Sequence, residues 1–245
     1  MFNPRFFNLN FFRFLIIVLT LLACNKSEIK LSKLNNSLKN FNNSELILKK
    51  YTVDNENNYL FDFEVSDFSL GKQTPNDFNF DLANSSKGQH IHLIVNNGPY
   101  FAKYSNSFKQ KLKYQNNTIL AFLSRSHHES VKSEKAYSLI QTGNEKFDSN
   151  TKLLFYSRPK GEYIGSVSKK ILLDFYLVNT EISKDGNKVK VTIDESEFIV
   201  TDWEPYLIEG LNDGEHTIKI ELIDSIGNLI PSPYNSASRI ITVEN

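Results

Sequence analysis

Apolar and polar residues alternate with a period of two in several short segments after residue 45. Residues 59–65, 171–177 and 189–193 alternate in this way. Turn-forming pairs such as Asn97-Gly98 and Asp213-Gly214 separate these segments. Successive strand residues face opposite sides of a sheet, so the pattern predicts short antiparallel strands joined by tight turns. No stretch after residue 45 keeps a helical period over ten residues, and the sequence predicts an all-β sandwich fold.

An internal repeat divides this β-rich region into two halves. Residues 112–123 align with residues 211–222 at an offset of 99. Residues 61–63 resemble residues 173–175 at an offset of 112, which implies a longer loop in the first copy around residues 72–88. Each copy has the length and strand number of an immunoglobulin-like domain. We therefore predict two tandem immunoglobulin-like β-sandwich domains.

The N-terminal segment has the pattern of a secretory signal. Residues 1–23 contain two arginines and no acidic residue, and they end in an apolar run that starts at Phe14. This run is shorter than the about 20 apolar residues that a membrane-spanning helix needs. It ends in Leu21-Leu22-Ala23-Cys24, which resembles the lipobox of bacterial lipoproteins. The resemblance implies cleavage before Cys24 and acylation of its thiol and new amino group, for example with palmitate. An ordinary signal peptide with a chance cysteine and an uncleaved anchor are the alternatives.

The lipidated cysteine would set both the location and the stability of the mature protein. It implies a cell-envelope protein anchored to membrane lipid, at the outer membrane, on the periplasmic or the cell-surface face. Cys24 is the only cysteine, so lipidation leaves no disulfide and the domains must be held by packing. Residues after Cys24 are polar and asparagine-rich, with a few spaced leucines, and we expect a flexible tether there that contains at most a short helix. The predicted parts are the signal peptide (residues 1–23), the lipidated cysteine with its tether (24–45), the first domain (46–148) and the second domain (151–245).

Charge and motifs exclude several classes of function. Without the two arginines of the signal peptide, the 28 basic residues fall to 26, against 28 acidic residues. This balance gives no basic face for nucleic acid. The chain lacks a G-x-S-x-G elbow, an H-E-x-x-H motif and a phosphate-binding glycine loop. Ser124 and Ser126 lie close to His128 and Glu129, but serine and histidine this close in a turn are usually incidental. We predict a non-enzymatic binding module for a protein, a peptide or a small ligand.

The repeat also assigns strand residues to faces. Outward positions in the second copy carry residues such as Lys190 and Glu221, whereas the first copy carries histidines and apolar residues there. A face of this kind should be covered by the 72–88 loop, by the second domain or by a partner. The outward residues of the first copy are His90, His92, Ile94, Leu120 and Phe122. Several aromatic residues occupy matched positions in the two copies, and we expect most of them to pack in the core or between strands: Tyr100, Phe101, Tyr104, Trp203 and Tyr206.

Four of the five histidines are expected to meet at one corner of the first domain. His90 and His92 are two residues apart in a predicted strand and therefore share a face. In an immunoglobulin-like sandwich the third and sixth strands are antiparallel neighbours, so the start of one lies beside the end of the other. His127, His128 and Glu129 follow the end of the sixth strand. Neutral imidazoles can bind zinc or copper, so His90, His92 and His128 form a candidate metal site with Glu129 as a fourth or outer ligand.

Two other interpretations of the histidine corner stay open. The imidazoles could form hydrogen bonds to an organic or anionic ligand, or they could have only a structural role. His216 is the remaining histidine, and we expect it at an exposed position between a turn and a strand, without special chemistry.

Longer segments resemble a known family. Residues 88–104 (GQHIHLIVNNGPYFAKY), residues 124–133 (SRSHHESVKS) and much of residues 172–235 are similar to a family of Bacteroidetes lipoproteins with tandem immunoglobulin-like domains. Some members of that family are described as phosphopeptide-binding, and the resemblance implies no demonstrated activity. The His-x-His strand also resembles the Gly-His-His-His strand of small periplasmic domains. This chain departs from that motif, because residues 88–92 read Gly-Gln-His-Ile-His.

Overall fold

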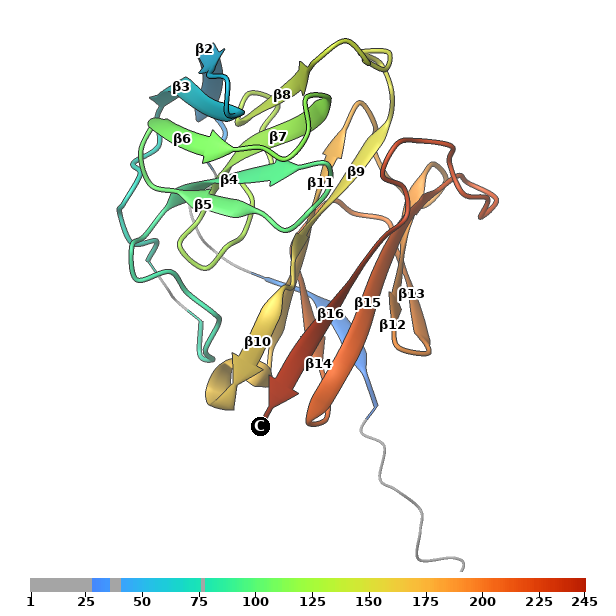
Figure 1. Cartoon of the computed structure of the whole chain (residues 1–245). Helices are drawn as coiled ribbons and strands as arrows, with labels where there is room; N and C mark the ends of the chain where they lie inside the picture. The colour runs from blue at the N-terminus through green and yellow to red at the C-terminus, as the bar shows by residue number, and fades with distance from the viewer. Residues whose placement is uncertain (1–27, 36–40, 76–77) are drawn as a thin grey trace, which may run out of the picture.

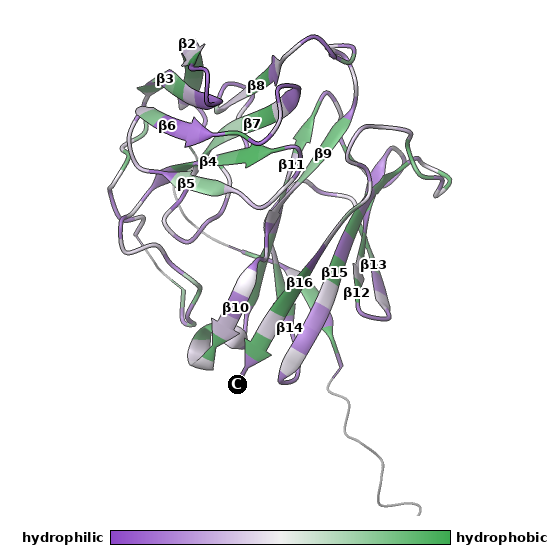
Figure 2. Ribbon diagram, in the orientation of Figure 1, coloured by the Kyte–Doolittle hydropathy of each residue, from purple (hydrophilic) through white to green (hydrophobic). Residues whose placement is uncertain are grey.

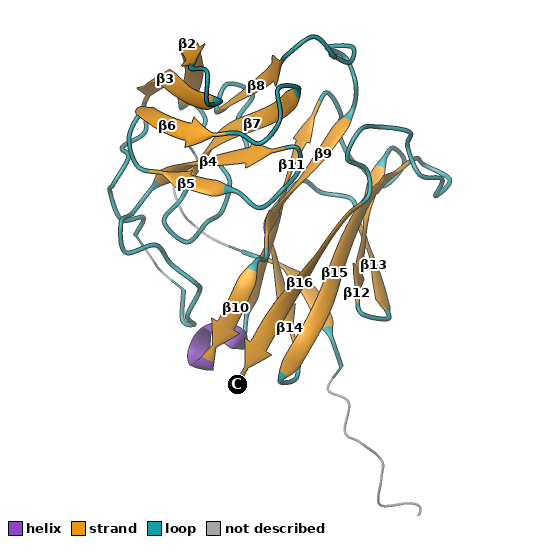
Figure 3. Cartoon of the chain, viewed as in Figure 1, coloured by secondary structure: helices purple, strands orange, loops and turns teal. Residues whose placement is uncertain are grey.

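The computed structural model describes residues 28–35, 41–75 and 78–245, and it is built almost wholly from β-strands (Figures 1 and 3). In this part of the chain the helical element is one short 3-10 helix, η2 (Gly165–Ser168). No helix within the described ranges is long and apolar enough to cross a membrane. The strands pair into four sheets. The predicted all-β sandwich fold is therefore confirmed.

The first domain is a sandwich of two sheets. Three strands form one sheet in the order β2-β3-β6, and four form the other in the order β5-β4-β7-β8. Neighbouring strands within each sheet run antiparallel. The strands are β2 (Glu45–Val53), β3 (Asn58–Ser66), β4 (His90–Val95), β5 (Phe101–Lys103), β6 (Ser107–Lys111), β7 (Asn117–Ser124) and β8 (Tyr137–Thr142).

The second domain repeats this plan with two additions. Its sheets have the orders β1-β14-β11-β9 and β10-β16-β15-β12-β13, and β10 pairs with β16 in parallel. β11 pairs with β9 and β14 as β3 pairs with β2 and β6, while β12 and β15 correspond to β4 and β7. The repeated segments seen in the sequence thus carry equivalent strands. The strands are β1 (Lys30–Lys33), β9 (Leu153–Arg158), β10 (Gly161–Ile164), β11 (Ile171–Val178), β12 (Lys188–Ile193), β13 (Ser196–Val200), β14 (Tyr206–Glu209), β15 (Gly214–Ile223) and β16 (Ala237–Glu244).

Three apolar clusters lie between the four sheets. One fills the first domain and another fills the second. The third joins the two domains: Ile94, Leu120 and Phe122 of the first pack on Phe155 and Tyr176 of the second. β4, β7, β9 and β11 are therefore apolar along most of their length, as their green colour in Figure 2 shows. The outward apolar face predicted for the first domain is covered by the second domain.

Part of the predicted tether is a strand rather than flexible chain. β1 pairs antiparallel with β14 at the edge of a second-domain sheet. Ile29 and Leu31 pack against the second-domain core, and Leu34 is buried beside Leu172 and Leu207. The expectation of a flexible tether is wrong for this stretch, because its spaced apolar residues are buried and its backbone completes a sheet edge. The predicted signal peptide and Cys24 lie outside the described residues, because these begin at residue 28. Residues 36–40 of the predicted tether lie outside them as well.

The long loop between β3 and β4 covers one side of the first domain. In this loop the backbone amide of Thr74 donates to Ser126 Oγ, and the backbone amide of Ser126 donates to Thr74 Oγ1, each at 3.1 Å. Leu82 is buried in the small apolar cluster that also contains Leu34, and Phe78 and Phe80 pack against it. The loop is thereby fixed to the turn that follows β7, where the candidate histidines lie.

Candidate functional site

Two histidines project from the same face of β4. The strand pairs with β7 so that His90 lies opposite Ser124 and His92 lies opposite Phe122. Side chains two apart in a strand share a face, so both imidazoles leave the first-domain core on the side that the second domain covers. Both side chains are fully buried. The predicted position of His90 beside the end of the sixth strand is confirmed.

His128 reaches the pair from the turn after β7. The amide of His128 donates to the carbonyl of Arg125 at 3.0 Å, and the amide of Arg125 donates to the carbonyl of Glu129 at 2.8 Å. His128 has a φ of 71°. This left-handed conformation costs a non-glycine residue about 1–3 kcal/mol, and such residues collect at functional sites. The turn is thus tightly bonded around one strained histidine.

Three imidazole nitrogens converge on one point. His90 Nε2 lies 2.9 Å from His92 Nε2, and His128 Nδ1 lies 3.2 Å from the first and 3.4 Å from the second. These atoms form the only group in the described residues in which three histidine, cysteine or acidic side chains converge tightly enough to hold a metal ion. Nitrogens that bind zinc tetrahedrally at 2.0–2.1 Å lie about 3.3 Å apart. The triangle therefore has the size that a tetrahedral metal ion requires.

The Nδ1 atoms of His90 and His92 contact groups outside the triangle. His90 Nδ1 lies 2.8 Å from the carbonyl of Gly88, and a carbonyl can only accept, so this nitrogen carries the proton. The Nε2 atom of His90 then presents a lone pair to the triangle in the neutral ring. His92 Nδ1 lies 3.2 Å from Ser157 Oγ, which belongs to β9 of the second domain. Bonds of this kind fix the tautomer and orientation of metal-binding histidines.

Burial keeps the three rings neutral. Desolvation lowers the pKa of His90 to about 4, and the positive charges of Arg158 and Lys160 act in the same direction. Desolvation also lowers the pKa of His92 and of His128 well below the ordinary value for histidine. Neutral imidazole is the form that binds metal ions. The site is therefore in its binding form at neutral pH.

Tyr100 closes the triangle on one side. Its ring stacks on that of His92, with centroids 3.6 Å apart and 9° between the planes. Its hydroxyl lies 3.2 Å from His128 Nδ1. Burial raises the pKa of Tyr100 to about 12, so the phenol keeps its proton. The sequence predicted a packing role for this residue, and the structure adds a polar contact at the site.

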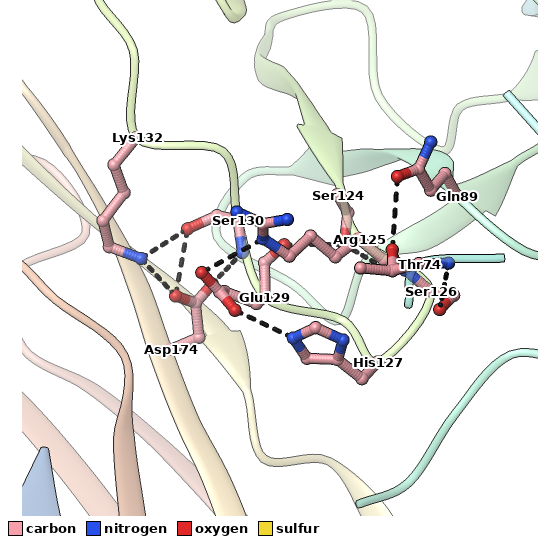
Figure 4. Close-up of polar contacts among 10 residues, drawn as sticks. All are labelled: Thr74, Gln89, Ser124, Arg125, Ser126, His127, Glu129, Ser130, Lys132 and Asp174. Atoms are coloured by element: carbon pink, nitrogen blue, oxygen red, sulfur yellow. Dashed lines mark hydrogen bonds and ion pairs between the residues drawn. The ribbon is translucent and has the colours of Figure 1, made fainter. Parts of the chain in front are cut away.

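His127 and Glu129 lie in the predicted turn and contact each other rather than the triangle. His127 Nε2 lies 2.8 Å from Glu129 Oε2, and the other carboxylate oxygen of Glu129 lies 3.3 Å from Arg125 Nε (Figure 4). The His127 ring also contacts Phe78 of the long loop edge to face. In a tight turn neighbouring side chains leave in different directions, so only His128 of this segment joins the triangle. The role of Glu129 as a ligand stays a prediction, and its carboxylate is engaged here by His127 and Arg125.

A second polar network fixes the same turn to the second domain. Asp174 of β11 is fully buried and accepts hydrogen bonds from the amide and hydroxyl of Ser130, at 3.2 and 3.0 Å. Lys132 also donates to this carboxylate (Figure 4). Burial raises the pKa of Asp174, while Lys132 and Ser130 oppose that shift. The network holds the segment that carries His128 against the sheet that carries Ser157.

Two basic side chains of the second domain lie next to the triangle. Lys160 Nζ lies 3.7 Å from the centroid of the Tyr100 ring and donates to the Tyr100 carbonyl at 2.9 Å. The guanidinium of Arg158 lies 5.9 Å from the same ring centroid and 5.7 Å from that of Tyr163. The site therefore combines three neutral imidazoles with two cations.

Sequence reasoning missed the residues that the second domain contributes. β9 reads Leu-Leu-Phe-Tyr-Ser-Arg, and its two polar residues at the end of a buried run are the signal that could have identified them. A register irregularity between Asp174 and Phe175 of β11 lies beside them, and bulges of this kind redirect side chains next to sites. The remaining histidine, His216, is half-buried rather than exposed, and its Nδ1 lies 2.7 Å from Asp194 Oδ2.

Comparisons with known proteins give structural neighbours but no family. No family model matches the chain, and no curated protein matches it. Among solved structures, the chain is similar to fibronectin(III)-like modules of Clostridium thermocellum CbhA, at 9% identity and a TM-score of 0.30, over 80% of this chain and 94% of that one. It is also similar to the Bacteroides ovatus mixed-linkage glucan utilization locus protein SGBP-B, solved with a mixed-linkage heptasaccharide. That match has 13% identity and a TM-score of 0.21, over 88% of this chain and 47% of that one. At these TM-scores neither neighbour bears on the ligand of this protein.

Proposed function

We propose that the protein is a non-catalytic binding protein whose ligand includes one zinc or copper ion, held by His90, His92 and His128. The observation that supports this is the triangle of imidazole nitrogens, 2.9–3.4 Å apart and buried between two domains. Three imidazoles suit zinc and copper better than hard ions such as magnesium or calcium, which take oxygen ligands.

The surroundings of the triangle support binding rather than catalysis. Many hydrolytic metal sites place a carboxylate base beside the metal-bound water. Within the described part of the chain, no aspartate or glutamate belongs to the three-histidine group. The nearest acidic residue in sequence, Glu129, is engaged by His127 and Arg125. A metal ion here would be held and released, or would join the two domains.

Metal content and stability test the proposal. Purified chain, stripped with a chelator and dialysed against zinc or copper, is expected to retain about one ion per chain, as a three-histidine site implies. It should also become more stable, by about 2.7 kcal/mol at a free metal concentration 100 times the Kd. The double variant His90→Ala/His92→Ala should lose both effects. The matched control His216→Ala, at a histidine outside the triangle, should keep both. The proposal would be overturned if the wild-type chain retained neither metal and neither metal changed its free energy of unfolding.

We also propose that Cys24 anchors the protein in the cell envelope. The lipobox-like segment before Cys24 and its status as the only cysteine support this. β1 begins at Lys30, so five residues separate it from Cys24. Five residues span at most about 18 Å, so an anchored chain would hold the second domain close to the membrane. Cys24→Ala should abolish incorporation of labelled palmitate and release the protein from the membrane fraction, whereas unchanged fractionation would contradict the anchor. Surface proteolysis of intact cells would then distinguish the periplasmic from the cell-surface face.

A further inference from the structure

Arg158 is a buried cation without a counter-charge. Only 6% of its surface is exposed. Its Nε atom is buried and has no hydrogen-bond partner, and within the described residues it forms no ion pair with an acidic side chain. Its guanidinium lies 5.9 Å and 5.7 Å from the centroids of the Tyr100 and Tyr163 rings, and these neutral rings supply no counter-ion. Arginine buried in this way normally binds a carboxylate or a phosphate.

The positive charge around Arg158 is not balanced by its neighbours. Burial and the nearby positive charges of Arg158 and Arg239 lower the pKa of Lys160 to about 8. Arg239 donates to three backbone carbonyls, those of Asn97, Gly98 and Tyr156, and these carry no net charge. The three histidines are neutral, so they contribute no negative charge either. A divalent metal ion on the triangle would add two further positive charges to this buried region.

The basic residues and the triangle meet at one side chain. Tyr100 has Lys160 3.7 Å from its ring centroid and stacks on His92 at 3.6 Å. Its hydroxyl is 3.2 Å from His128 Nδ1, and Arg158 lies 5.9 Å from its ring centroid. A metal ion with three protein nitrogens keeps a fourth coordination position. Lys160 and His92 contact opposite faces of the Tyr100 ring, so the ring lies between Lys160 and the triangle. An anion at the fourth position would supply the negative charge that the buried guanidinium of Arg158 lacks.

We propose that the metal ion binds together with a small anion bearing a carboxylate or phosphate group. One oxygen of this anion takes the fourth position on the metal, and the negative charge of the anion compensates the guanidinium of Arg158. This inference rests on the proposed metal site and specifies its ligand as a metal–anion pair. Lys160 is half-buried and the following Gly161 is exposed, so the basic end of β9 lies near the protein surface.

Zinc affinity measured with and without anions tests the inference. The purified chain is titrated with zinc, or with copper if zinc is not retained, in a non-coordinating buffer. The same titration is repeated with millimolar acetate, with millimolar inorganic phosphate, and with perchlorate at matched ionic strength. We expect acetate or phosphate to raise the apparent metal affinity at least about tenfold, a change of about 1.4 kcal/mol, and perchlorate to leave it unchanged. The stronger of the two anions identifies the group that the site recognises.

Variants separate this inference from the proposed metal site. Arg158→Gln should remove the effect of the anion while binding zinc in anion-free buffer at least as tightly as wild type, because a nearby positive charge is gone. Lys160→Gln removes a positive charge on the far side of the Tyr100 ring, so it should weaken the anion effect less than Arg158→Gln does. Lys190→Gln, on β12 and paired with Glu221 at 3.1 Å, is the matched control and should keep it. Circular dichroism at each step verifies folding. Zinc binding that is equal in all buffers, or an anion effect that persists in Arg158→Gln, would overturn the inference and leave the metal site standing. Absence of zinc binding in every buffer would instead overturn both.

Discussion

Acidification of the metal-free protein should destabilise it through His90. The folded-state pKa of His90 is about 4, and its ordinary value is 6.5. Below 6.5 the unfolded chain binds this proton and the folded chain does not, so the stability is present above 6.5 and is lost as the pH falls toward 4. Between about pH 7.5 and about pH 5 the difference amounts to about 2 kcal/mol for His90 alone. The lowered pKa of His92 adds a loss in the same direction.

Urea unfolding of chelator-treated protein measures this loss. Trp203 is the only tryptophan and packs against both the second-domain core and the interdomain cluster, so its fluorescence reports unfolding. We expect the free energy of unfolding to fall by at least about 2 kcal/mol between the two pH values. His90→Gln removes the titrating ring, so this variant should lose about 2 kcal/mol less than wild type over the same range. Comparison with this variant also separates His90 from the carboxylates that titrate nearby. Equal pH dependence in the two proteins would refute the reasoning.

Three substitutions test the parts of the molecule that support the site. Ser157→Ala removes the partner of His92 Nδ1 and should weaken metal binding by about 10–100-fold, measured by competition with a chelator. Phe122→Ala truncates a fully buried ring that stacks on the second domain, and it should lower the free energy of unfolding by about 3–5 kcal/mol. Asp174→Asn leaves Lys132 without its buried counter-charge and should cost about 3–5 kcal/mol.

Each of these predictions has a control within the chain. Ser157→Thr keeps a hydroxyl and should recover much of the metal affinity, whereas a Ser157→Ala protein with wild-type affinity would contradict a role for the second domain. Phe101 is 44% exposed, and Phe101→Ala should cost less than about 1 kcal/mol in the same urea assay. If Phe122→Ala also lowered the free energy of unfolding by less than about 1 kcal/mol, the two domains would not share a core. Lys132→Met combined with Asp174→Leu should be less destabilising than Asp174→Asn alone, because no buried charge is left unpaired.

The shared face of His90 and His92, and their closeness to the turn that carries His128, follow from regular β-structure. The two-residue period places the first two on one face, and strand pairing in a sandwich brings the end of β7 beside the start of β4. The roles of His127 and Glu129 could not be deduced in this way, because a tight turn containing a left-handed residue has no fixed side-chain period. Period and pairing are therefore sufficient for strand residues and insufficient for turn residues.

Contributions from the second domain were beyond sequence reasoning for a different reason. Ser157 and Arg158 meet the triangle only because the two sandwiches pack through their outer faces, and that docking has no local sequence pattern. The strand at residues 30–33 was missed for the same reason. Its partners on β14 are 173 to 179 positions further along the chain, and its apolar residues are few. Long-range packing, rather than local propensity, decides these features.

X-ray absorption spectroscopy of the metal-loaded chain tests the central claim most directly. The three-histidine triangle predicts a coordination shell of three imidazole nitrogens at about 2.0–2.1 Å for zinc, completed by one oxygen ligand. The His90→Ala/His92→Ala variant should lose this spectrum. A shell with fewer than three imidazoles in the wild-type protein, or a metal that dissociates during buffer exchange, would contradict the account.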